Sequence, residues 1–157
     1  MKNQKLMIAR IVMTVLTVAA IAAIFYNSSL DAVESTEQSS PLTEWINSIL
    51  ARFPIPFSVT ENFIRKLAHF TEYSILGVML SVTYHLYFRR VKRVLLASLP
   101  TGAVVAVCDE LIQLIPAGRS AQVSDVLLDC CGVVFGTLIV AVFISKIELK
   151  RRKKNNE

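Results

Sequence analysis

Acidic and basic side chains occur inside apolar segments in the second half of the chain. The stretch VCDELIQLIPAGRSAQVSDVLLDCCG, residues 107–132, places carboxyl groups and an arginine within or beside apolar runs. Such groups can act as general acids and bases, hold the charged head of a ligand or coordinate a metal ion. The polar residues in question are Asp109, Glu110, Gln113, Arg119, Asp125 and Asp129.

A second polar group lies upstream, in the stretch RKLAHFTEY, residues 65–73. His69, Glu72 and Tyr73 have the spacing of one helical face, and Lys66 precedes His69 by less than one turn. A divalent metal held by His69, Glu72 and Asp109 is one version of an enzyme site. The HxxE spacing alone is weak support, so we predict no metal site and leave the cofactor unassigned.

The elements that must position these residues are predicted to be membrane helices. Hydrophobic residues make up 54% of the 157 residues and charged residues only 18%, a composition on the membrane side of globular averages. Four apolar stretches have the roughly 20 residues that cross a hydrocarbon core of about 30 Å. We predict a single all-α membrane domain over residues 1–157, a four-helix bundle with helices at about 7–26, 67–88, 94–115 and 124–145.

The distribution of lysine and arginine predicts the orientation of these helices. Most of the 17 basic residues lie on one side, in the N-terminal segment, the turn at 89–93 and the tail at 146–157. Because positive residues are retained in the cytoplasm, we expect both termini there. We expect the basic tail to contact anionic lipid rather than nucleic acid. The first apolar run continues to Tyr26, which favours a retained span; a signal peptide cut near residues 20–22 is the alternative.

The outer loop between the first two helices, about residues 27–58, is rich in serine and acidic residues. Apolar residues from Trp45 to Phe53 recur within it at helical spacing, with Ser40 as the predicted N-cap and Pro41 at the first helical position. Such a helix would lie in the outer membrane interface or pack over the top of the bundle.

Two local patterns refine the predicted helices. Ser58 and Glu61 have the spacing of a capping box, so the second helix is predicted to begin near Val59. Gly132 and Gly136 form a GxxxG pattern, which allows two membrane helices to approach closely.

Polar residues from three helices are expected at a similar depth. Asp109 lies six residues before Ile115, the predicted outer end of its helix, or about 9 Å along the axis. Glu72 and Asp129 each lie five residues inside the predicted starts of their own spans. An unpaired carboxylate at the membrane centre costs about 2.5–3.5 kcal/mol. We therefore interpret the cluster as a site at the outer face; hydrogen bonding that only fixes the helices together is the alternative.

We favour a function in which an outward-facing polar pocket binds or acts on a cell-envelope amphiphile. The ligand-binding candidates are Lys66, His69, Glu72, Asp109, Glu110, Gln113, Arg119, Asp125 and Asp129. The alternative is an outer-leaflet hydrolase or transferase, so whether the protein is an enzyme stays open. Its catalytic candidates are His69, Asp109, Glu110 and Arg119. A proton-coupled transporter lacks acids along the cytoplasmic halves of the helices, and a passive packing subunit is the fourth hypothesis.

The segments KLAHFTEYSILG and DELIQLIPAGRSAQVSDVLLDCCGVVFG resemble the VanZ-like family of small bacterial membrane proteins, which is related to teicoplanin resistance. The Ser-rich stretch FYNSSLDAVESTEQSS is also similar, so the resemblance covers about residues 25–136. The matching positions are Lys66, His69, Gly77, Asp109, Glu110, Gln113, Arg119, Asp125, Gly132 and Gly136. Asp129 stands where many members are expected to have Asn, which changes the charge of any inherited site.

The resemblance implies a multi-pass protein of the bacterial plasma membrane. Some members of the family reduce susceptibility to glycopeptide or lipopeptide antibiotics, which implies an effect on antibiotic resistance at the cell envelope. The implied partners are the lipid bilayer and a lipid-like, lipopeptide or glycopeptide ligand, with no nucleic acid. The resemblance implies no particular reaction.

Overall fold

The computed structural model describes residues 2–30, 32–53, 58–116 and 121–155, and these ranges contain helices and no strands. This confirms the all-α prediction. The helices are α1 (Lys2–Ser28), α2 (Ala32–Leu50), α3 (Glu61–Phe88), α4 (Val91–Ile112) and α5 (Val123–Asn155).

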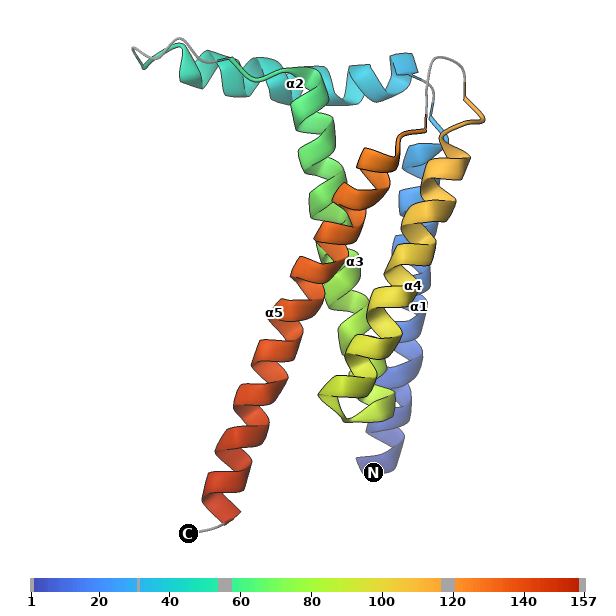
Figure 1. Ribbon diagram of the computed structural model, residues 1–157, viewed down its shortest axis with the longest axis vertical. Helices are drawn as coiled ribbons and strands as arrows, with labels where there is room; N and C mark the ends of the chain where they lie inside the picture. The colour runs from blue at the N-terminus through green and yellow to red at the C-terminus, as the bar shows by residue number, and fades with distance from the viewer. Residues whose placement is uncertain (1, 31, 54–57, 117–120, 156–157) are drawn as a thin grey trace.

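Helices α1, α3, α4 and α5 run lengthwise, and α2 lies across one end of them (Figure 1). Helix α3 is central because it contacts all the other helices, whereas α4 contacts α1, α3 and α5. The start of α1 and the end of α5 lie at the end away from α2 (Figure 1). We call the opposite end, where α3 begins and α4 leads into α5, the α2 end.

Three of the helices are long and apolar enough to cross a membrane. These segments are Asn3–Ser28, Val91–Ile112 and Val123–Lys150. Helix α3 has the length, at 28 residues, but polar side chains such as Glu72 and His85 interrupt its apolar runs. A central helix covered by neighbours can carry such residues, because they face protein rather than lipid. Three of the predicted spans are thus supported by length and composition, and the span over 67–88 stays a prediction.

Helix α2 begins earlier than predicted. It starts at Ala32, so Pro41 lies inside the helix and Ser40 is not its N-cap. Glu34 in the first turn favours this start, because a negative charge is stabilised near a helix N-terminus. The Ser40 hydroxyl instead donates a hydrogen bond to Glu61 Oε1 of α3 at 2.8 Å. The predicted cap was therefore wrong, and Ser40 links α2 to α3.

Helix α3 begins at Glu61, two residues after the predicted start near Val59, and Ser58 is not its N-cap. The N-cap is Thr60, whose hydroxyl oxygen accepts a hydrogen bond from the Phe63 N–H at 3.3 Å. Val59 is held outside the helix by the Asn47 side chain of α2, whose Oδ1 accepts from the Val59 N–H at 2.8 Å and whose Nδ2 donates to its carbonyl at 3.0 Å. This pair of bonds fixes α2 across the start of α3.

The GxxxG pattern places α5 directly against α3. A Cβ added at Gly132 would lie 2.7 Å from the Phe70 carbonyl oxygen, and one at Gly136 would overlap the carbonyl oxygen of Ser74. Both contacts are with backbone, which cannot move aside as a flexible side chain could. The two helices therefore pack more closely than residues with side chains would allow.

We predict that Gly136→Ala lowers the thermal midpoint of the purified protein by several degrees. The added methyl group must push α5 away from Ser74, and overpacking of this kind costs about 1–3 kcal/mol. The measurement is size-exclusion chromatography in detergent after heating. Leu138→Ala, at a position 52% exposed on the same helix, is the matched control and should change the midpoint little. Equal midpoints for the two variants would contradict the close packing.

Candidate functional site

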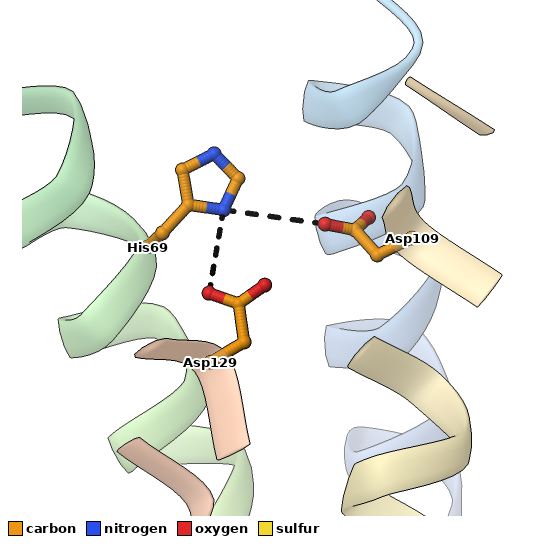
Figure 2. A group of neighbouring side chains, drawn as sticks. All are labelled: His69, Asp109 and Asp129. Carbon is orange, nitrogen blue, oxygen red and sulfur yellow. Dashed lines mark ion pairs between the residues drawn. The ribbon is translucent and has the colours of Figure 1, made fainter. Parts of the chain in front are cut away.

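Three helices bring a histidine and two aspartates together near the α2 end (Figure 2). His69 comes from α3, Asp109 from α4 and Asp129 from α5. His69 Nδ1 lies 3.8 Å from Asp129 Oδ1 and 4.0 Å from Asp109 Oδ2. The side chains of Asp109 and Asp129 are 0% and 1% exposed, whereas that of His69 is 19% exposed. We call these three residues the polar centre.

The position of each residue along its helix explains why they meet. Asp109 lies in the last turn of α4, His69 about 12 Å along α3 from its start, and Asp129 about 9 Å along α5. Gly132 lies just beyond Asp129, and Phe70 follows His69, so the close contact between Gly132 and the Phe70 carbonyl draws these two helices together beside the polar centre.

The two aspartates are incompletely hydrogen-bonded. Asp109 Oδ2 accepts a hydrogen bond from Gln113 Nε2 at 3.4 Å. Asp109 Oδ1 and both carboxylate oxygens of Asp129 are buried without a hydrogen-bond partner among the described residues. Within the same ranges, His69 is the only basic side chain within 4.0 Å of either aspartate. Because a buried carboxylate without such partners is costly, this arrangement favours an additional proton or cation.

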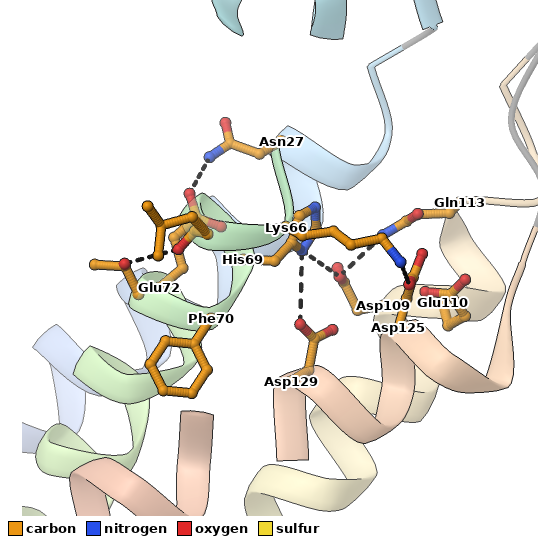
Figure 3. Close-up of polar contacts among 12 residues, drawn as sticks. Asn27, Lys66, His69, Phe70, Glu72, Asp109, Glu110, Gln113, Asp125 and Asp129 are labelled. Atoms are coloured by element: carbon orange, nitrogen blue, oxygen red, sulfur yellow. Dashed lines mark hydrogen bonds and ion pairs between the residues drawn. The ribbon is translucent and has the colours of Figure 1, made fainter. Parts of the chain in front are cut away.

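Glu110 is buried beside the polar centre and points to the segment that leads into α5. Its side chain is close to the Asp125 end of α5 (Figure 3), and its Oε1 accepts a hydrogen bond from the Gln122 N–H at 2.5 Å. Glu110 itself is 4% exposed. The carboxylate therefore connects the end of α4 to the start of α5, a structural role that its position after Asp109 did not predict.

An ion pair joins α3 to α5 at the solvent-facing edge of the cluster. Lys66 Nζ lies 2.8 Å from Asp125 Oδ1, and the side chains are 37% and 23% exposed. Lys66 reaches past His69 to make this contact (Figure 3). A pair this accessible contributes up to about 1 kcal/mol to stability. Its larger effect is to place both signs of charge next to the polar centre, and we call it the rim pair.

Glu72 points away from the polar centre. Its Oε1 accepts a hydrogen bond from Asn27 Nδ2 of α1 at 3.1 Å (Figure 3). It also lines a groove of about 150 Å³ between α1 and α3. The group formed by His69 and Asp109 is thus completed by Asp129 and not by Glu72. Arg119, the other residue expected at the site, lies outside the described residues.

Two residues at this end were not anticipated from the sequence. Asn27 binds Glu72, and Ser28, which is 1% exposed, lies beside Asp109. Both are small polar residues in the last turn of α1, after the apolar run of residues 18–25. That break in the apolar run is the signal that could have indicated them.

The arrangement has defined chemical capabilities. An imidazole between two carboxylates can serve as a general base, because a carboxylate orients the ring and stabilises its protonated form. The same three side chains offer one nitrogen and two oxygen ligands, all within 4.8 Å of one another. Imidazole together with carboxylates suits several divalent metal ions.

The chain belongs to the VanZ/LLP1 family, whose model matches residues 13–144. This confirms the resemblance found in the sequence. Together with the three apolar helices, it defines the chain as a VanZ-like membrane protein. The matched region contains the polar centre and the rim pair. No curated protein and no solved structure matches the chain.

Proposed function

We propose that this VanZ-like protein binds the polar head of a cell-envelope amphiphile at the α2 end and thereby alters susceptibility to glycopeptide or lipopeptide antibiotics. The observation that carries this proposal is the convergence of polar side chains from three helices at one end of an apolar bundle. Ionisable residues placed among membrane helices are functional by default, because their burial has to be offset by some interaction.

The rim pair and His69 are the groups that an incoming head could reach. Lys66 and Asp125 are opposite charges 2.8 Å apart and partly exposed, so a zwitterionic head could bind both at once. The buried carboxylates beneath them add a negative field, which favours a cationic group on the ligand. This arrangement supports a zwitterionic or cationic head over an anionic one.

The apolar part of the ligand would lie along exposed side chains next to the cluster. On α5, Leu127 and Phe135 are 61% and 52% exposed, and on α3 Phe63 and Leu67 are 55% and 48% exposed. In a bilayer these residues face acyl chains. A lipid tail could therefore remain in the membrane while its head contacts the rim pair.

The location we propose is the bacterial plasma membrane, with both termini in the cytoplasm and the α2 end outside. The basic segments at 89–93 and 146–154 belong to the end away from α2, as the retention of positive charge in the cytoplasm requires. Helix α2 exposes Leu42 and Trp45, which are 48% and 60% exposed. A helix with such residues is suited to the outer interface.

Reporter fusions test this orientation. We predict that green fluorescent protein fused after the C-terminal residue is fluorescent and that alkaline phosphatase at the same position is inactive, because the basic tail stays in the cytoplasm. Phosphatase inserted after Arg52 should be active. Active phosphatase at the C-terminus with an inactive insertion at Arg52 would contradict the proposed orientation.

Complementation of a deletion strain tests the proposed function. We predict that Asp109→Asn, Glu110→Gln and Asp125→Asn each shift susceptibility to envelope antibiotics towards that of the deletion. Asp125→Asn removes the negative member of the rim pair, and the other two substitutions remove buried negative charge beneath it, so each should weaken binding of the head. The measurement is the inhibitory concentration at matched membrane levels of each variant.

Glu148→Gln is the control, because this carboxylate lies on α5 in the basic segment away from the cluster. It should complement as well as the wild-type protein does. If the three cluster variants accumulate normally and also complement fully in a strain where the deletion has an effect, the proposed function is wrong.

A further inference from the structure

We infer that the polar centre binds one divalent transition-metal ion through His69 Nδ1 and one carboxylate oxygen each from Asp109 and Asp129. The ion would occupy the buried base of the cluster, beneath the rim pair. Metal binding there is expected whether or not an amphiphile binds to the rim pair.

The spacing of the three side chains suits one ion. Bonds of about 2.0–2.2 Å from a metal to nitrogen and carboxylate oxygen place neighbouring ligand atoms about 3–4 Å apart. His69 Nδ1 lies 3.8 Å from Asp129 Oδ1 and 4.0 Å from Asp109 Oδ2. These separations are too long for hydrogen bonds. An ion between the three groups would contact all of them after small side-chain rotations.

The unbonded carboxylate oxygens are a second and independent observation. Asp129 is 1% exposed, and neither of its oxygens has a hydrogen-bond partner among the described residues. Asp109 is 0% exposed, and its Oδ1 also has no hydrogen-bond partner within those ranges. Its carboxylate lies beside Ser28, Tyr73 and Gln113, however, so Asp129 is the more weakly satisfied of the two. Both carboxylates point towards His69 (Figure 2). A bound cation would give these oxygens the interaction that the surrounding protein does not.

The charges of the three side chains also favour a divalent cation. Two ionised aspartates carry the charge that one divalent cation neutralises, and a neutral imidazole adds a ligand without adding charge. The nearest ammonium group of the rim, that of Lys66, lies 2.8 Å from Asp125 and is engaged there. A cation in the polar centre would therefore leave the Lys66–Asp125 ion pair intact.

The ligand types select the class of metal. Mg²⁺ and Ca²⁺ prefer oxygen ligands, whereas a histidine together with carboxylates suits Zn²⁺, Mn²⁺, Fe²⁺ and Co²⁺. Three protein ligands leave at least one coordination position for water or a ligand group. His69, with 19% of its side chain exposed, is the route by which solvent reaches the site.

Metal binding to the full-length protein tests this inference. The protein is purified in detergent without a histidine tag, stripped with a chelator and dialysed against micromolar ZnCl₂ or MnCl₂, with MgCl₂ as a separate arm. Mass spectrometry of the metal content then gives the stoichiometry. We expect one Zn²⁺ or Mn²⁺ per chain and no retention of Mg²⁺. Binding should weaken at least tenfold in Asp129→Asn and in His69→Gln.

Two further variants keep the result decisive. Glu72→Gln should bind metal as the wild type does, because Glu72 faces Asn27. If Asp129→Asn does not elute as a folded protein, Asp109→Asn replaces it. Absence of stoichiometric Zn²⁺ or Mn²⁺ in the wild-type protein would overturn the inference, as would loss of binding in Glu72→Gln with retention in Asp129→Asn. Because no amphiphile is present, these results are independent of the antibiotic phenotype.

Discussion

The direct contact between the backbones of α3 and α5 is the constraint on which the rest of the structure depends. Gly132 and Gly136 allow α5 to rest against the carbonyl groups of Phe70 and Ser74, and Gly77 of α3 lies against the backbone of Val133 in return. Helix α4 then packs against both helices. Near the α2 end, where these three helices meet, α3 contributes His69, α4 contributes Asp109 and α5 contributes Asp129 to the polar centre.

Close packing also raises the free-energy cost of burying the two carboxylates of the polar centre. The same contact that brings His69 to Asp129 excludes water from two carboxylates. The Gly132 and Gly136 contacts join α3 to α5 through backbone packing in which the aspartates take no part. The cost of burying the aspartates is consistent with a ligand that offsets it. A metal ion in the buried base would neutralise Asp109 and Asp129 and would leave Glu110 and the rim pair to the proposed amphiphile head.

Much of this architecture is readable from the sequence, because hydropathy and helical rise are local properties. The apolar runs predicted α1, α4 and α5, and counting residues inward from helix ends placed Asp109 and Asp129 at a similar depth. The direction in which a side chain points from its helix was harder to predict from the sequence. Glu72 was expected beside His69, but the packing of α1 against α3 turns it towards Asn27.

The observed starts of α2 and α3 differ from the predicted starts for a related reason. The start of α3 depends on Asn47, which binds both backbone groups of Val59 from another helix. Capping patterns describe neighbours in the chain and contain no information about such a contact. The start of α2 was predicted too late in the chain, because Pro41, a residue type common in the first turn, lies well inside that helix.

We infer that the buried aspartates serve a ligand and not the stability of the fold. The most direct measurement is the thermal midpoint of Asp129→Asn and wild-type protein, both purified in the presence of a chelator. The substitution keeps the size of the side chain and removes the buried carboxylate, so we predict a higher midpoint for Asp129→Asn. A midpoint clearly below that of the wild type would contradict the account, because it would mean that the carboxylate itself holds the helices together.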